Sequence, residues 1–286
     1  MVVHGLGVEP QRVGTNVGEV EVRDQGFGLP VVLVHPALTN HDLWAGTADA
    51  LAPEHRVIRV TLPMGAHRIP SSDRTRLVLP NLADALVEVL DHLGVPSAAF
   101  VGCDSGGAVV QNVVARRPDR VSGVFLFSCE VFGNFPPRSI RPVTLAMRIP
   151  GAWRLLAAYR WTPVQWWGAL ALVMRRRPDA AFAESCFGPS TRDPRIRRDL
   201  GALLASARPA HLRGCTPSFA NFLGPVELCW SDGGRLLFPH GDGRRLARCF
   251  PDGRFSVIEG CRAFAMLDQP EESVAVLRRF LRERVV

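Results

Sequence analysis

The sequence predicts an α/β fold with a mostly parallel sheet, helices on both faces of that sheet and a helical cap insertion. Short apolar runs, typical of strands buried on both faces, alternate with segments of helical periodicity in the first half and the last quarter of the chain. Between them, from Glu130 to about Gly224, prolines, aromatic residues and arginines dominate and no run is typical of a strand. We therefore expect one core domain, 1–130 and 225–286, with a helical cap at 131–224.

The first expected strand alternates apolar and charged residues and is followed by Gly26 and Gly28, whereas the later strands are mostly continuous apolar runs. The first expected helix has apolar residues spaced three or four apart. Strands are expected at 17–23, 31–35, 56–62, 98–102, 121–129, 226–230 and 255–259, and helices at 82–93, 106–117, 242–249 and 271–284.

Composition argues against several classes of protein. The 286 residues are 47% hydrophobic, enough for a large buried core. The net charge of +7 comes from arginine alone, because the chain has no lysine, and the longest arginine run is 175–177. A nucleic-acid-binding protein would show a basic stripe with a recognition motif. We expect a small-molecule substrate as the partner, with no nucleic acid and no membrane; whether the chain forms a homodimer stays open.

Seven cysteines without a C-x-x-C pair are typical of free thiols in a reducing compartment. The first ten residues lack the charged-then-apolar order of a signal peptide, and no apolar run is long enough to span a bilayer. The chain contains no dinucleotide fingerprint, P-loop or cluster with metal-ligand spacing. We therefore expect a cytoplasmic protein that needs no cofactor and no metal.

Asp104 stands between an expected strand and an expected helix, in the segment VGCDSGG at 101–107. A strand, a tight glycine-flanked turn and a helix are the setting of a nucleophile elbow, which lifts the apical side chain above the sheet. A carboxylate at that apex would attack carbon and form an alkyl ester. We therefore expect Asp104 to take part in the chemistry.

Four segments resemble the α/β-hydrolase superfamily, most closely its aspartate-nucleophile branch of epoxide hydrolases and haloalkane dehalogenases. They are VHPALTN at 34–40 with the following Leu43-Trp44, PMGAHRIP at 63–70, GCDSGG at 102–107 and DQPE at 268–271. The resemblance covers nearly the whole chain and implies the α/β-hydrolase fold. It also implies Asp104 as the nucleophile and the backbone N–H groups of Ala37 and Ser105 as an oxyanion hole.

The same resemblance leaves two family positions without their usual residues. The relay acid normally ends a W-G-x-x-D pattern, and WSDGG at 230–234 has Gly234 there, with Asp232 two residues earlier. The histidine normally stands in G-x-x-H-F, and GCRAF at 260–264 has Ala263. Hydrolysis of an aspartyl ester needs a base that activates water. We therefore expect a degenerate catalytic triad.

Six further residues complete the expected site. Glu130 follows a strand at the carboxyl edge of the sheet, where ligands bind in open α/β folds, and His67 lies in a loop near the mouth of such sites. We expect both to assist Asp104, although His67 suits a structural hydrogen bond equally well. The expected substrate-binding residues are His35 and three cap tryptophans that suit a flat apolar ligand, namely Trp153, Trp166 and Trp167.

These observations predict a cofactor-independent enzyme of specialised metabolism, such as antibiotic or other natural-product biosynthesis. Its expected reaction is non-hydrolytic acid–base chemistry on a polycyclic apolar substrate: cyclisation, isomerisation or C–C bond formation. Two alternatives stay open. One is an epoxide-hydrolase-like enzyme in which Asp104 attacks and another group replaces the histidine; the other is a ligand-binding protein without catalysis.

Overall fold

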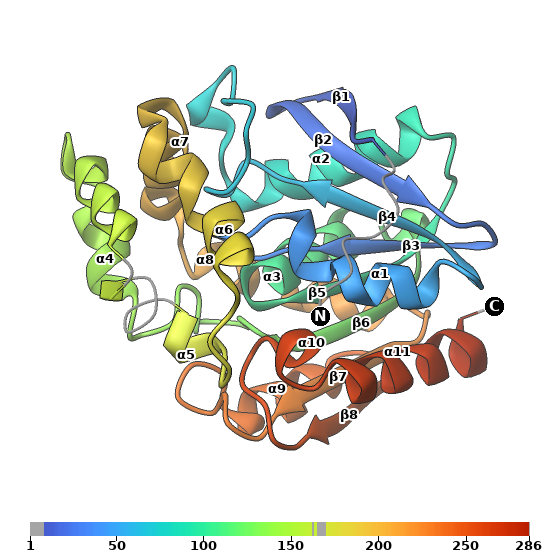
Figure 1. Cartoon of the computed structure of the whole chain (residues 1–286). Coiled ribbons are helices and arrows are strands. Elements are labelled where there is room, and N and C mark those ends of the chain that lie inside the picture. The colour runs from blue at the N-terminus through green and yellow to red at the C-terminus, as the bar shows by residue number, and fades with distance from the viewer. Residues whose placement is uncertain (1–8, 162, 165–169, 286) are drawn as a thin grey trace.

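The computed structural model describes residues 9–161, 163, 164 and 170–285, which include an eight-stranded sheet (Figure 1). The strand order is β1-β2-β4-β3-β5-β6-β7-β8. Strand β2 runs antiparallel to β1 and β4, and all other neighbours are parallel. The strands are β1 (Gln11–Thr15), β2 (Gly18–Gln25), β3 (Leu29–Val34), β4 (His55–Thr61), β5 (Ala98–Cys103), β6 (Val121–Cys129), β7 (Val226–Ser231) and β8 (Gly253–Ile258).

Helices cover both faces of the sheet (Figure 1). Helix α1 (Ala45–Leu51) packs beside α11 (Pro270–Arg284) on one face, and α2 (Leu79–His92) packs beside α3 (Asp104–Arg116) on the other. Helix α9 (His240–Ala247) lies against β7 and β8, and the short α10 (Ala265–Asp268) precedes α11. The central strands are therefore buried on both sides, which explains their continuous apolar sequences.

Between β6 and β7 the described residues form helices and loops and no strand. We use the name cap for residues 131–224, as predicted. Its helical elements are α4 (Arg141–Ala146), η4 (Ala152–Arg160), α5 (Ala171–Val173), α6 (Ala180–Arg192), α7 (Pro194–Ser206), α8 (Ala210–Arg213) and η6 (Thr216–Asn221). Figure 1 shows α4, α6 and α7 to one side of the sheet, with α4 outermost.

The expected strands and helices are present, with ends shifted by a few residues, and the mostly parallel sheet is confirmed. Strand β1 and helix α1 were not expected. Strand β1 is a polar edge strand that pairs with β2 through its backbone and buries only Val13, so its sequence lacks an apolar run. Helix α1 has seven residues, too few to display a helical period.

Three further findings bear on the expected class. Within the described part of the chain, no helix combines the length and apolar character needed to cross a membrane. The seven cysteines are all free, and six of them are buried. No group of three or more histidine, cysteine and carboxylate side chains in that part of the chain is arranged to hold a metal ion.

Candidate active site

Asp104 sits where β5 ends and α3 begins, with a backbone φ of 49°. A positive φ is uncommon for a residue other than glycine and stores strain in the turn. The turn is possible only because its neighbours lack side chains: a Cβ on Gly106 would lie 2.4 Å from the Val34 carbonyl oxygen, and one on Gly102 would lie 2.9 Å from the Gly107 Cα. The predicted elbow is therefore present, and Asp104 stands at its apex.

Hydrogen bonds hold one oxygen of the Asp104 carboxylate. The Ser105 N–H donates to Asp104 Oδ1 at 2.6 Å, and the Ala37 N–H donates to Ser105 Oγ at 2.8 Å. The Ser105 hydroxyl also hydrogen-bonds Asp104, and both Ser105 contacts act to lower the pKa of that carboxyl group. The structure thus links Ala37 and Ser105 to the carboxylate, with the Ala37 donor acting through the serine hydroxyl.

Glu130 lies beside Asp104, because a parallel β-bridge joins Asp104 to Cys129 at the end of β6. Its side chain is buried, its Oε2 has no hydrogen-bond partner among the described residues, and Gln111 anchors its backbone by donating to the Glu130 carbonyl at 2.7 Å. Burial raises the pKa of Glu130 well above its usual range, and the charge of Asp104 raises it further. Burial also raises the pKa of Asp104, against the Ser105 hydrogen bonds.

The two side chains form a carboxyl pair. Two neighbouring carboxylates in a site of low polarity oppose each other's ionisation. The hydrogen bonds from Ser105 favour the charged form of Asp104, whereas burial and the charge of Asp104 oppose the ionisation of Glu130.

Both carboxyl groups line one cavity of about 370 Å³, here called the carboxyl cavity. Ala37 and Ser105 line it too, and most of the remaining wall is apolar and comes from the cap, including Phe135, Leu203 and Phe187. A largely apolar cavity with a few convergent polar groups is the usual form of a small-molecule site. No metal-ligating cluster lines it within the described residues.

His211 of α8, which is not among the predicted site residues, also lines the carboxyl cavity. Its Nδ1 has no hydrogen-bond partner among the described residues, and burial lowers its pKa. No motif surrounds His211 in the sequence, so only the fold of the cap reveals that it reaches the site.

The positions that the resemblance assigns to the relay acid and the histidine lie close together. A Cβ on Gly234 would lie 2.4 Å from Ser231 Oγ and 3.7 Å from both the Ala263 nitrogen and Ser128 Oγ. The Ser128 and Ser231 hydroxyls are hydrogen-bonded to each other at 3.0 Å. This serine pair occupies the space into which a side chain at Gly234 would extend.

Asp232 lies beside these positions but outside the wall of the carboxyl cavity. It accepts hydrogen bonds from the Cys261 N–H and from Arg175. Backbone N–H groups and the Arg175 charge lower its pKa against the effect of burial. Its carboxylate therefore anchors the 260–264 loop.

His35 and His67 do not line the carboxyl cavity. His35 is buried, with its ring hydrogen-bonded to the Pro36 carbonyl and the Leu62 N–H, and burial lowers its pKa to about 4. Both ring nitrogens of His67 are also engaged, by the Gly65 N–H and by the buried Asp199. In this structure each ring supports a loop, so we give neither a role in catalysis or substrate binding.

Trp153, the expected tryptophan that lies within the described residues, does not line the carboxyl cavity. Trp153 packs against Gly201 of α7 and lies among the guanidinium groups of Arg154, Arg197 and Arg198. Trp166 and Trp167 lie outside the described residues. The aromatic ring that the described cap does bring to the cavity from η4 is Tyr159, which stacks on Phe187.

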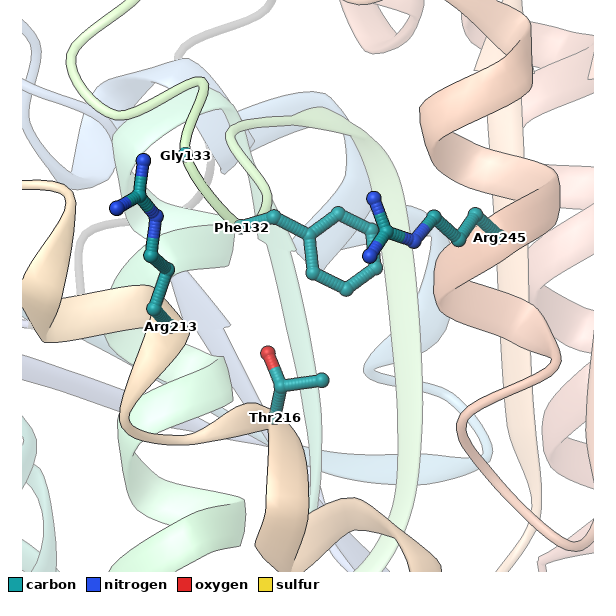
Figure 2. A pocket seen from close by; sticks show the side chains of 5 residues that line it. All are labelled: Phe132, Gly133, Arg213, Thr216 and Arg245. Atoms are coloured by element: carbon teal, nitrogen blue, oxygen red, sulfur yellow. The ribbon is translucent and has the colours of Figure 1, made fainter.

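The loop that follows Glu130 is held from the outside by arginines, as Figure 2 shows for a second, surface pocket of about 390 Å³. Arg245 lies over the Phe132 ring, 4.4 Å from its centre, and Phe132 has a φ of 51°. On the other side, a Cβ at Gly133 would lie 2.8 Å from Arg213 Nη2. These contacts position the loop, and this pocket shares no lining residue with the carboxyl cavity.

Comparisons with known proteins agree with this geometry. The family described as alpha/beta hydrolase fold matches residues 30–157. Haloalkane dehalogenase 2 of Mycobacterium tuberculosis is 26% identical over 285 residues, with 92% of each chain covered. A solved structure of a putative ancestral haloalkane dehalogenase superposes with a TM-score of 0.78 at 18% identity, covering 96% of this chain and 98% of that one.

These matches show that the chain has the α/β-hydrolase fold. The relatives that it matches over nearly its whole length include haloalkane dehalogenases. The chain is also similar to parts of longer proteins. It is 35% identical over 107 residues to the dihydrolipoyllysine-residue acetyltransferase component of the acetoin cleaving system of Pseudomonas putida, and the match spans 28% of that protein's length.

Proposed function

We propose that this enzyme opens epoxides by hydrolysis, with Glu130 as the acid and Asp104 as the nucleophile. The observation that supports the proposal is the carboxyl pair: Asp104 and Glu130 line the same largely apolar cavity, and Asp104 accepts hydrogen bonds from Ser105. We assign the proton to Glu130 and the negative charge to Asp104, because burial and the charge of Asp104 raise the pKa of Glu130. Ring opening needs these two groups, since a proton donor must meet the leaving oxygen while a nucleophile attacks carbon.

The first step forms a bond between a carboxylate oxygen of Asp104 and a ring carbon. The carbon–oxygen bond of the epoxide breaks, and the proton of Glu130 moves to the leaving oxygen. The product is a hydroxyalkyl ester of Asp104, and Glu130 is left as a carboxylate. Because Glu130 is ionised only after this step, it becomes a base at the point where a base is needed.

The second step consumes one water molecule. The Glu130 carboxylate takes a proton from water, and the water oxygen adds to the ester carbonyl carbon. The Ser105 N–H stabilises the charge that develops on Oδ1. The ester bond then breaks, the released alkoxide takes the proton left on the Asp104 carboxyl group, and the diol departs. Asp104 is again ionised and Glu130 again protonated, so no histidine is required.

Relatives lead us to put this hydrolytic route first, although the sequence analysis favoured a non-hydrolytic one. Haloalkane dehalogenase 2 matches nearly the whole chain, and an esterase of Escherichia coli is 29% identical over 106 residues. The apolar cavity wall favours an aromatic or other ring-containing substrate.

A second candidate is the non-hydrolytic reaction expected from the sequence. In it Asp104 removes a proton from carbon while Glu130 protonates an oxygen, as in the isomerisation or cyclisation of a polycyclic natural-product intermediate. The observation that favours it is the absence of an ionisable side chain at both Gly234 and Ala263, which leaves water without its usual activator.

Turnover of aromatic epoxides in ¹⁸O-labelled water tests the proposal. We expect a diol, and a single turnover should place ¹⁸O in the Asp104 carboxylate. Asp104→Asn should form no diol, and Glu130→Gln should lower turnover by roughly 10²- to 10⁴-fold. Glu19→Gln, which removes an exposed carboxylate of β2 outside the cavity wall, is the control and should retain activity.

Two other outcomes would contradict hydrolysis. A rearranged product that contains no solvent oxygen would support the non-hydrolytic candidate. Binding without any reaction, unchanged in Asp104→Asn, would identify a ligand-binding protein.

A further inference from the structure

The positive charge of the chain is concentrated in one part of the cap. Residues 131–178 contain eight of the 34 arginines and none of the 27 aspartate and glutamate residues, so this stretch has a charge of +8 while the rest of the chain has −1. No single helix carries all eight, which is why the sequence analysis found no basic face.

Exposed apolar side chains are concentrated in the same stretch. Among the described residues, five of the nine large apolar side chains that are exposed lie there. Leu145, Ile149 and Leu155 expose 61%, 63% and 69% of their surface. We call this surface the cap edge; it consists of Val143, Leu145, Ile149, Leu155 and Trp161 with the neighbouring Arg154 and Arg160.

The cap edge is the outer side of α4 and of the 3₁₀ helix η4. Their inner side chains Met147 and Leu156 pack with Leu200 of α7 in a small separate core. Figure 1 shows α4 at the outer limit of the molecule, farther from the sheet than α7. Arg160 lies over the exposed Trp161 ring, 5.4 Å from its centre. The apolar side chains of the edge therefore face outward with arginines beside them.

The carboxyl cavity opens next to this edge. Of the described side chains that line the cavity, only Ser139 and Val143 are exposed; the others are buried or half-buried. Val143 belongs to α4 and to the cap edge, whereas the carboxyl pair lies at the opposite, sheet side of the cavity. The exposed part of the described cavity wall thus adjoins the cap edge.

We propose that the cap edge docks on an anionic lipid bilayer and that a lipophilic substrate passes from the bilayer into the carboxyl cavity. Exposed leucine, isoleucine and tryptophan side chains partition into the boundary between head groups and acyl chains, while arginines bind anionic head groups. The absence of carboxylates from 131–178 removes the repulsion that such head groups would otherwise meet. Docking does not depend on the proposed reaction; only the route of the substrate rests on it.

Co-sedimentation with vesicles tests this docking. We expect the full chain to bind vesicles that contain phosphatidylglycerol, to bind pure phosphatidylcholine weakly and to lose binding as the salt concentration rises. The double variant Leu145→Glu/Ile149→Glu should lower the partition coefficient about tenfold or more, and Arg154→Gln/Arg160→Gln should do the same.

Matched controls remove the same kinds of side chain elsewhere. Leu223→Glu alters a leucine that is 80% exposed near β7, and Arg12→Gln/Arg254→Gln removes two exposed arginines of β1 and β8. Both controls should bind vesicles as the unaltered chain does. The proposal would be overturned if the controls lost vesicle binding to the same extent, or if the unaltered chain did not bind phosphatidylglycerol vesicles at low salt.

Light scattering without vesicles tests whether the cap edge binds a second copy of the chain instead of a bilayer. If the chain is a dimer that Leu145→Glu/Ile149→Glu converts to a monomer, the cap edge is a subunit interface and the proposal is wrong. Turnover of a water-soluble epoxide, measured without vesicles, should be the same in this variant and in the unaltered chain. Absent turnover with intact vesicle binding would refute the proposed reaction and leave docking standing.

Discussion

At the scale of single residues, Glu130 lies in an environment that is unusual for a glutamate, because its side chain is buried. A buried carboxyl group with an unpaired oxygen is costly, and the cost is smallest when the group stays protonated. The same environment raises the pKa of Glu130 and reduces the stability of the fold. A residue of this kind is typical of functional sites rather than of structural ones.

Glu130→Gln should change how stability depends on pH. Because the pKa of Glu130 is raised on folding, the folded state binds its proton more tightly than the unfolded state. Linkage then requires the free energy of unfolding to fall as pH rises from the unfolded pKa through the folded one, by up to about 1.4 kcal/mol per pH unit. Glu130→Gln lacks the titrating group and therefore this decline. The free energy of unfolding of the variant, relative to that of the unaltered chain, should therefore increase with pH.

Urea unfolding at several pH values between 5 and 8 measures the difference. Glu19→Gln, which removes an exposed carboxylate of β2, is the control and should follow the unaltered chain. An equal effect of Glu130→Gln at every pH would refute the retained proton.

At the scale of elements, the junction of β5 and α3 depends on close backbone approach. Gly106 lies so near β3 that a Cβ would be 2.4 Å from the Val34 carbonyl oxygen and 2.7 Å from that of His35. Backbone atoms in the middle of a sheet cannot shift without moving the sheet. The glycines of the elbow thus set where Asp104 stands relative to Ala37.

Gly106→Ala should therefore destabilise the chain by about 1–3 kcal/mol, in the range of overpacked core sites, and should also lower turnover. Gly46→Ala is the control: Gly46 lies in α1 and is exposed, and a methyl group on its Cα would have no other atom within 4 Å. Alanine there should stabilise the helix by up to about 1 kcal/mol. Chemical denaturation measures the free energy of unfolding of both variants. A similar change in the two would show that close backbone approach at Gly106 does not limit stability.

At the scale of the whole molecule, one buried carboxylate joins the cap to the core. Asp199 of α7 is fully buried and accepts hydrogen bonds from the Ser71 N–H, from Arg74 Nε and from His67 Nε2. All three donors lie in the loop between β4 and α2. This contact keeps α7, and with it part of the cavity wall, in place over the sheet.

Asp199→Ala should lower the free energy of unfolding by about 3–5 kcal/mol, because it leaves buried donors without an acceptor. Asp119→Ala breaks the exposed ion pair with Arg117 and should have a much smaller effect. Thermal and urea unfolding of both variants check this. If Asp199→Ala lowers the free energy of unfolding only slightly, water replaces the carboxylate, and the contact does not hold the cap on the core domain.

The α/β architecture, the elbow at Asp104 and the lack of a histidine at Ala263 were predictable from contiguous segments, because apolar periodicity, glycine spacing and residue identity are local properties. Which side chains meet became clear from the folded chain. It paired Asp104 with Glu130, brought His211 to the cavity and directed His35 and His67 into loops. Burial and proton retention arise between residues distant in sequence, so no local pattern contains them.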